Sequence, residues 1–189
     1  DYDAGNVKSV QNALKKLGFE AMITSDIETI KNADKVIFPG VGEASSAMKK
    51  LQERGLDAVI PNLKQPVLGI CLGMQLMCNA SEEGNTKALG IFDCEVKLFP
   101  NSDIVPHMGW NNVSEMKGKL LENISEIDNF YFVHSYYAEI GESTTSVCDY
   151  ITPFSATLEK DNFYAAQFHP EKSGDAGFKL LENFLNLRF

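Results

Sequence analysis

Apolar residues in the first eighty positions recur at two spacings, one helical and one strand-like. Residues 7–17 carry apolar side chains at helical spacing, after Asn6 as a predicted N-cap and before Gly18 as a stop. Residues 44–51 repeat this pattern, and residues 72–79 read as a third helix.

Short apolar runs lie between these helices, at 21–24, 35–38 and 67–70. The last of them is uninterrupted, which suits a strand covered on both faces. Strands that alternate with helices predict an open, mostly parallel sheet flanked by helices.

The second half of the chain is richer in strand-like segments. We expect strands at 94–99, 110–113, 130–137, 145–150, 155–159 and 163–168. Residues 160–162, Lys-Asp-Asn, predict a hairpin turn between the last two, and an amphipathic helix over 174–187 closes the chain. The fold class is therefore α/β: one domain over residues 1–189, with an additional antiparallel strand region.

Residues 1–6 read as the end of a strand and the loop that enters a helix. This pattern predicts that a first strand is missing or truncated at the N-terminus. The length of 189 residues fits one domain.

Composition narrows the classes of function. The net charge is −9 and the pI is near 4.8, and no basic stripe interrupts the acidic surface, so nucleic acid is not expected as a partner. No apolar run is long enough to span a membrane, and no signal-peptide pattern points to export. A cytoplasmic location is the resulting expectation.

The chain has four cysteines, at positions 71, 78, 94 and 148. None forms a C-x-x-C pair and their spacing matches no zinc pattern, so we expect reduced cysteines, no metal and no cofactor. Only Cys71 has neighbours that suggest chemistry.

Cys71 lies at the centre of a G-x-C-x-G sequence, residues 69–73, where a buried strand should give way to a helix. Such a turn can project a nucleophile, and the start of a helix favours a thiolate. The backbone N–H of Leu72 would be a natural donor to an oxyanion. The alternative is an ordinary turn with a buried cysteine.

A nucleophilic cysteine needs a base, and the chain has three histidines. His134 falls within a predicted strand, where a hydrogen-bonded core histidine is the simplest interpretation. His169 ends a predicted strand and is followed by Pro170 and Glu171, whose carboxylate could hold the second ring nitrogen. His107 lies in the segment 106–110.

Residues 39–42, Pro-Gly-Val-Gly, form a second glycine-rich corner after a strand. Neighbouring parallel strands end at the same sheet edge, so this corner could face Cys71. The N–H of Val41 could then supply the other half of an oxyanion hole. A plain strand-to-helix turn is the alternative; no phosphate-loop sequence follows.

In order and spacing, residues 39–42, 69–75 and 167–171 resemble the class I (triad) glutamine amidotransferases. Residues 107–111, residues 3–6 and Lys172 narrow the resemblance to the glutaminase subunits of imidazole glycerol phosphate synthase within that family.

The resemblance implies a glutaminase with a Cys71, His169 and Glu171 triad. Cys71 would form a thioester with glutamine, His169 would shuttle the proton and Glu171 would orient His169. The remaining site residues implied by the resemblance, as oxyanion or glutamine contacts, are Val41, Gly42, Leu72, Gln75, Ser135 and Tyr136.

The resemblance also implies a heterodimer. The partner would be a cyclase with a (β/α)₈-barrel fold, of the HisF type, which receives the ammonia and makes imidazole glycerol phosphate and AICAR in histidine biosynthesis. Glutaminase turnover would stay low until the partner carries its ligand. The residues expected near this interface are Asn6, Ser9, His107, Trp110 and Lys172.

Other functions remain open from the sequence. The chain could be the glutaminase of another synthase, such as one in a surface-sugar, pyridoxal phosphate, anthranilate or GMP pathway. A cysteine peptidase would need a cleft for extended peptides, and an inactive binding subunit would not need all three triad residues.

Overall fold

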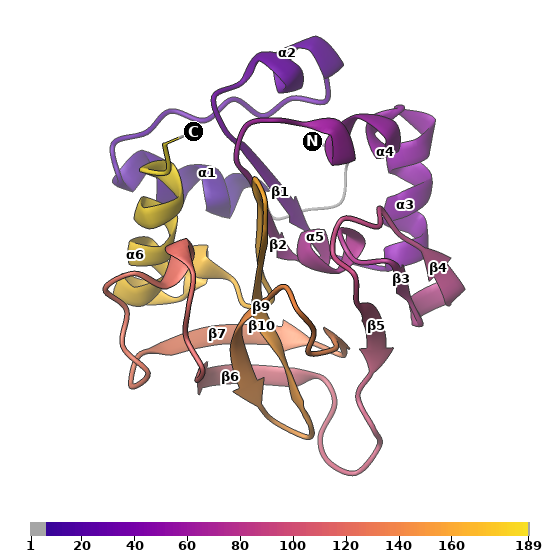
Figure 1. Cartoon of the computed structure of the whole chain (residues 1–189), viewed down its shortest axis with the longest axis vertical. Helices are drawn as coiled ribbons and strands as arrows, with labels where there is room; N and C mark the ends of the chain where they lie inside the picture. The colour runs from indigo at the N-terminus through magenta and orange to yellow at the C-terminus, as the bar shows by residue number, and fades with distance from the viewer. Residues whose placement is uncertain (1–6, 189) are drawn as a thin grey trace.

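The architecture is that of a computed structural model, which describes residues 7–188 (Figure 1). Its α-helices are α1 Val7–Lys16, α2 Ile27–Asn32, α3 Ala44–Glu53, α4 Leu56–Val59, α5 Leu72–Leu76 and α6 Gly174–Leu185. Short 3₁₀ helices are η1 Ile60–Asn62, η2 Glu83–Asn85, η3 Lys119–Leu121 and η4 Pro170–Lys172.

The strands fall into three sheets. Their bounds are β1 Val36–Gly40, β2 Val67–Cys71, β3 Ala80–Ser81, β4 Thr86–Lys87, β5 Glu95–Leu98, β6 His107–Asn112, β7 Asn129–His134, β8 Tyr136–Ala138, β9 Thr144–Asp149, β10 Pro153–Lys160 and β11 Phe163–Ala166. The orders are β1-β2-β11-β10-β9, β4-β3-β5-β8 and β6-β7. The α/β class with an antiparallel addition is confirmed.

The five-stranded sheet positions the site. Strands β1, β2 and β11 run parallel, and β10 and β9 continue the sheet antiparallel. In Figure 1, α3, α4 and α5 lie on one side of this sheet, while α1 and α6 lie on the other. Strand β2 is buried along its whole length, and its side chains enter two separate core clusters, with Val67 in one and Leu68 in the other. The uninterrupted apolar run reflects burial of both faces.

Four predicted elements differ from the structure. The strand predicted at 130–137 is two strands, β7 and β8, which belong to different sheets. Residues 21–24, predicted as a strand, are not part of any strand among the described residues. The predicted helix 72–79 ends at Leu76. The carbonyls of Leu76, Met77 and Cys78 accept hydrogen bonds from residues 89–92 instead of from a further helical turn. The strand predicted at 110–113 begins earlier, at His107, because residues 107–112 pair throughout with β7.

The predicted first strand and the Asn6 N-cap lie outside the described residues. The C-terminal helix and the hairpin around residues 160–162 are confirmed as α6 and as β10 and β11.

Candidate active site

Cys71 occupies a strained backbone position where β2 passes into α5. Its φ of 53° and ψ of −111° lie outside the regions that L-residues favour. The flanking glycines serve close packing: a Cβ at Gly69 would lie 2.5 Å from Met77 Sδ, and one at Gly73 would overlap the carbonyl oxygen of Phe38. The strain is thus concentrated on the cysteine, while Gly69 lets the α5 segment pack closely on β2 and Gly73 lets α5 approach β1.

His169 and Glu171 form a buried pair at the end of β11. His169 Nδ1 lies 2.8 Å from Glu171 Oε1, with the two side chains 2% and 1% exposed. The short helix η4 makes this pairing possible because it turns the chain between the two residues. The ring nitrogen that contacts the carboxylate carries the proton, since an ionised carboxylate can only accept.

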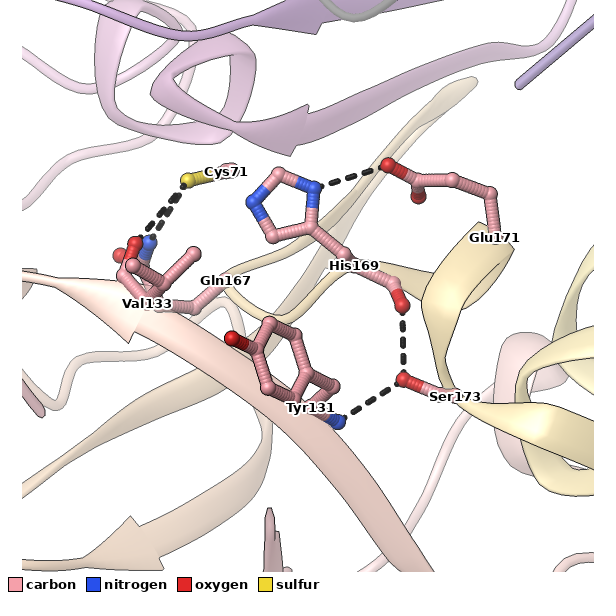
Figure 2. Close-up of polar contacts among 7 residues, drawn as sticks. All are labelled: Cys71, Tyr131, Val133, Gln167, His169, Glu171 and Ser173. Carbon is pink, nitrogen blue, oxygen red and sulfur yellow. Dashed lines mark hydrogen bonds and ion pairs between the residues drawn. The ribbon is translucent and has the colours of Figure 1, made fainter. Parts of the chain in front are cut away.

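The backbone around His169 is held by strand β7. The N–H of His169 donates to the carbonyl of Tyr131 at 2.9 Å, and Ser173 Oγ donates to the carbonyl of His169 at 2.6 Å. Ser173 Oγ also accepts from the N–H of Tyr131 at 2.9 Å (Figure 2). The imidazole therefore projects from a fixed backbone.

Figure 2 shows the second ring nitrogen of His169 turned toward the sulfur of Cys71. This Nε2 atom is buried and has no hydrogen-bond partner among the described residues. Burial alone disfavours the imidazolium, but the interactions with Cys71 and Glu171 outweigh it and raise the pKa of His169 to about 9. At neutral pH the ring is therefore held in its charged form beside the sulfur.

A cavity of about 340 Å³ opens onto these groups and is lined by residues from five parts of the chain. It contains six of the predicted contacts: Val41, Gly42, Leu72, Gln75, Ser135 and Tyr136. Its other lining residues are Cys71, Glu83, Val133, His134 and His169.

The predicted oxyanion corner lies beside Cys71. Gly40, the last residue of β1, pairs with Cys71 in the parallel register. Val41 and Gly42 therefore leave the sheet at the edge where Cys71 begins its turn. The donor roles of the Val41 and Leu72 N–H groups stay a prediction.

Sequence reasoning missed Glu83 as a lining residue. It lies on η2, between β3 and β4, and its Oε2 accepts from the N–H of Ala44 at 2.8 Å. Partial burial raises its pKa, with the Ala44 hydrogen bond acting in the opposite direction. No local signal distinguishes Glu83 from the other surface acids, because only the tertiary fold brings it to the cavity.

Gln167 and Val133 were also missed, and both contact the sulfur. Gln167 Nε2 lies 3.7 Å and the carbonyl oxygen of Val133 lies 3.9 Å from Cys71 Sγ. Gln167 stands two residues before His169 in the segment that carried the resemblance, so its position was the available signal.

His134 and His107 form a buried pair next to the cavity. His134 Nδ1 donates to the carbonyl of Tyr136 at 2.7 Å, so its Nε2 accepts from His107 Nδ1 at 3.1 Å. Burial lowers the pKa of His107 to about 4 and that of His134 to about 3. The hydrogen-bonded core interpretation of His134 agrees with these contacts, although this residue also lines the cavity.

The predicted interface residues have different surroundings. His107 is only 3% exposed, stacked between Phe132 and Tyr150, so its side chain does not present a surface to a partner. The register against β7 turns its side chain inward and leaves Trp110 58% exposed. Ser9 is half-buried, Lys172 is exposed, and Asn6 lies outside the described residues.

The remaining cysteines are free thiols, with Cys78 and Cys148 buried and Cys94 half-buried. Within residues 7–188, no cluster of three or more His, Cys, Asp or Glu side chains could hold a metal ion. No helix in this part of the chain has the length and apolar character needed to cross a membrane.

Residues 1–187 match the family model described as Glutamine amidotransferase class-I. The chain is 59% identical over 189 residues to the imidazole glycerol phosphate synthase subunit HisH of Bacteroides fragilis strain YCH46, covering 98% of this chain and 96% of that protein. It is 46% identical over 195 residues to the subunit of that name in Vibrio parahaemolyticus, covering 99% of this chain and 96% of that protein.

Among solved structures, a putative GMP synthase subunit from Thermoplasma acidophilum superposes with a TM-score of 0.73 at 18% identity. The match covers 98% of this chain and 89% of the other. A structure titled glutamine amidotransferase gives a TM-score of 0.71 at 21% identity, covering 96% and 93%. At these identities the likeness concerns the fold.

Proposed function

The chain belongs to the class-I glutamine amidotransferase family, and we propose that it is the glutaminase subunit of an imidazole glycerol phosphate synthase. In this role it hydrolyses L-glutamine to glutamate and ammonia and delivers the ammonia to a cyclase subunit in the cytoplasm. The observation that carries the proposal is the single cavity onto which Cys71 and His169 both open, with Glu171 paired behind His169.

The geometry supports acyl transfer through the sulfur. The Cys71 thiolate attacks the side-chain amide carbon of glutamine, forming a C–S bond and a tetrahedral oxyanion. As the intermediate collapses, the C–N bond breaks and the His169 imidazolium gives its proton to the leaving nitrogen, releasing ammonia. His169 then takes a proton from water, which attacks the thioester and frees glutamate and the thiolate.

Glu171 stabilises the imidazolium in each of these steps because its carboxylate accepts from Nδ1. The N–H groups of Val41 and Leu72 are the proposed donors to the oxyanion, which forms at the edge where β1 and β2 end.

The cavity suits a small zwitterion. A volume of about 340 Å³ accommodates one amino acid, and the Glu83 carboxylate at its wall can pair with an α-ammonium group. Gln75, Ser135 and Tyr136 also line the cavity and are the proposed polar contacts of glutamine. This size argues against a peptidase, which binds several residues of an extended chain.

A route from a partner to the site exists through strands β6 and β7. Trp110 pairs in register with Tyr131, whose carbonyl accepts the N–H of His169. Met108, 63% exposed, pairs with Val133, whose carbonyl lies beside the Cys71 sulfur. We propose that the cyclase, a (β/α)₈ barrel, docks over Met108 and Trp110, with Ser9 and Lys172 near the contact.

Coupling to the partner is proposed to act through the corner 40–42. Gly42 has a φ of +102°, and the position where a Cβ would project has no atom within 4 Å, so this corner has space to rearrange. A peptide that turns its N–H away removes an oxyanion donor, which costs on the order of 100- to 1000-fold in rate. Equal glutamine turnover with and without liganded cyclase would contradict this switch.

The test is a glutaminase assay on the purified chain, alone, with the barrel cyclase, and with the cyclase plus its ligand. We expect glutamate release to rise with the cyclase and to be abolished by Cys71→Ala, while Cys148→Ala, a control for a buried thiol elsewhere, keeps it. Full activity of Cys71→Ala would contradict the nucleophile. Stimulation by the barrel of a surface-sugar pathway, and none by the histidine cyclase, would reassign the synthase.

A further inference from the structure

Gln167 is a buried amide that the mechanism above does not use. It is fully buried and follows β11, and its N–H donates to the carbonyl of Ala156 at 2.8 Å. Figure 2 shows its side chain reaching the Cys71 sulfur from the side of Val133. A polar side chain at this depth needs fixed partners, because an unpaired buried amide is costly.

The partners of Gln167 determine which end of its amide faces the sulfur. The carbonyl of Tyr136 can only accept, so Gln75 presents its Nε2 group to it at 2.9 Å. The same Nε2 donates at 3.0 Å to Oε1 of Gln167. Gln167 must then direct its own Nε2 toward Cys71 Sγ, at 3.7 Å.

The opposite orientation of Gln167 would be unfavourable at both ends. Its Nε2 group would face the Nε2 group of Gln75, and its oxygen would face the sulfur. His134 Nδ1 also donates to the carbonyl of Tyr136, which holds this acceptor in place. One backbone carbonyl thus sets the direction of two successive amides.

The sulfur meets one donor and one acceptor in this arrangement. The carbonyl of Val133 can receive a hydrogen bond only from the thiol form of Cys71. Gln167 donates best to the thiolate, because hydrogen bonds to a charged acceptor are the stronger ones.

We propose that Gln167 is a further residue of the catalytic site, which donates a hydrogen bond to the Cys71 thiolate and owes its direction to the Tyr136 carbonyl through Gln75. This inference rests on the proposed glutaminase function. During thioester hydrolysis the same donor stabilises the sulfur as it departs with the electron pair of the C–S bond.

The test measures the thiolate without requiring turnover. The full chain is alkylated with iodoacetamide between pH 5 and 10, and the Cys71 peptide is quantified by mass spectrometry. Replacing Gln167 with the uncharged, similarly long Met should move the alkylation midpoint of Cys71 up by about one pH unit, as expected for loss of a hydrogen bond to a charged group. Gln167→Glu, which places an anion beside the sulfur, should move it at least as far.

Two controls accompany these variants. Gln65→Leu removes another amide hydrogen bond, the one from Gln65 Nε2 to the carbonyl of Ile30. This bond lies at the opposite end of β2 from Cys71, so the alkylation midpoint of Cys71 should stay unchanged. Cys94, which is half-buried, is an internal reference whose alkylation should not change in any Gln167 variant. Circular dichroism establishes that each variant is folded.

The role of Gln75 is tested by a double-mutant cycle. Gln75→Met should raise the midpoint of Cys71 because it frees the Gln167 amide to turn, and the double variant should shift little further than Gln167→Met alone. Additive shifts would overturn the relay through Gln75.

An unchanged midpoint in both folded Gln167→Met and folded Gln167→Glu would overturn the donor itself. Should either variant fail to fold, the other decides the outcome. If the Gln167 variants show the expected shifts but the wild-type chain shows no glutamine turnover with the cyclase, the proposed function fails while the donor role stands.

Discussion

At the scale of single residues, the carboxylate of Glu171 is proposed to maintain the charge on His169. Glu171→Gln keeps an acceptor oxygen for Nδ1 but removes its negative charge. A hydrogen bond to a charged group contributes about 1.5–3 kcal/mol, so we expect kcat/KM for glutamine with the cyclase bound to fall roughly 10- to 150-fold. The loss should be smaller than that of Cys71→Ala or His169→Ala.

The same variant should change the alkaline limb of the pH profile. The pKa of His169 is raised from its ordinary 6.5 to about 9, so its protonated form persists until the pH rises through about 9. We expect kcat/KM to fall over that range in the wild type and at lower pH in Glu171→Gln. Identical alkaline limbs would mean that Glu171 does not support the charge on His169.

His107 and His134 make a different pH prediction, for folding. Their folded-state pKa values of about 4 and about 3 lie below the unfolded value of 6.5, so only the unfolded chain gains their protons as the pH falls below 6.5. Stability should therefore decrease on acidification toward pH 4. The slope approaches about 1.4 kcal/mol per pH unit for each fully neutral histidine.

Urea unfolding between pH 7 and 5 measures this effect. His169 does not contribute to the slope at the acidic end of this range, because it is protonated there in both the folded and the unfolded chain. His107→Phe, which keeps a ring between Phe132 and Tyr150, should unfold with a shallower pH dependence. An equal slope in that variant would assign the effect to other groups.

Residue types at fixed spacing were enough to predict Cys71, His169 and Glu171, because the signal of each is local. Cys71 lies in a glycine-flanked turn, His169 lies at the end of a strand, and Glu171 follows two positions later. Glu83 could not be found in this way, and for Gln167 the spacing indicates the position of the residue but not its contact with the sulfur. Glu83 lines the cavity because η2 lies between two strands of a separate sheet, β3 and β4. The direction of the Gln167 amide is set by the carbonyl of Tyr136, which lies much earlier in the chain. The burial of the His107 side chain was not predicted for a similar reason, since it depends on the pairing of β6 with β7.

At the scale of elements, the contact between α5 and β1 depends on Gly73. An added methyl group would overlap the carbonyl oxygen of Phe38, a backbone atom in the middle of β1 that cannot rotate away. We expect Gly73→Ala to lower the free energy of unfolding by about 1–3 kcal/mol or more, since forced backbone shifts in packed regions cost this much. Glutamine turnover should also fall, because α5 carries Leu72 and Gln75.

Gly141→Ala is the matched control. A Cβ at Gly141 would meet only the carbonyl oxygen of Asp93 at 3.7 Å, an ordinary contact, so the change should stay within about 0.5 kcal/mol. Urea denaturation of both variants makes the comparison. Equal stabilities for Gly73→Ala and Gly141→Ala would show that α5 can move away from β1 without cost.

Hydrophobic periodicity predicted the central elements because burial leaves a clear trace in each: β2 is buried on both faces, and α3 and α6 each bury one face. The same reasoning extended α5 too far. Met77 and Cys78 continue the apolar pattern, but their carbonyls accept hydrogen bonds from residues 90–92 and so do not continue the helix. Strands β3 and β4 are two residues each and leave no periodic signal. Element ends were therefore decided by long-range pairing.

At the scale of the whole molecule, the sheet of β6 and β7 links an exposed surface to Cys71 and His169, the proposed catalytic groups. Its outer side carries Met108 and Trp110, and the β7 residues paired with them contact Cys71 and His169 through their backbone carbonyls. In Figure 1 these two strands lie across the end of the molecule opposite α2. A partner bound over β6 would therefore press on the backbone that positions both reacting groups.

Trp110 is an exposed aromatic residue on this surface, at 58% exposure, and packs edge-on to Tyr131. Tryptophans near the centre of an interface often contribute about 2 kcal/mol or more, so Trp110→Ala should weaken binding of the barrel cyclase by roughly 30-fold or more. Met22→Ala is the control. Met22 is another exposed apolar residue, 77% exposed, in the segment between α1 and α2, and its replacement should leave the affinity for the cyclase unchanged. Calorimetric titration with the cyclase measures both. Equal affinities in the two variants would place the docking surface away from β6, and the backbone route from Trp110 through Tyr131 to His169 would lose its role in activation.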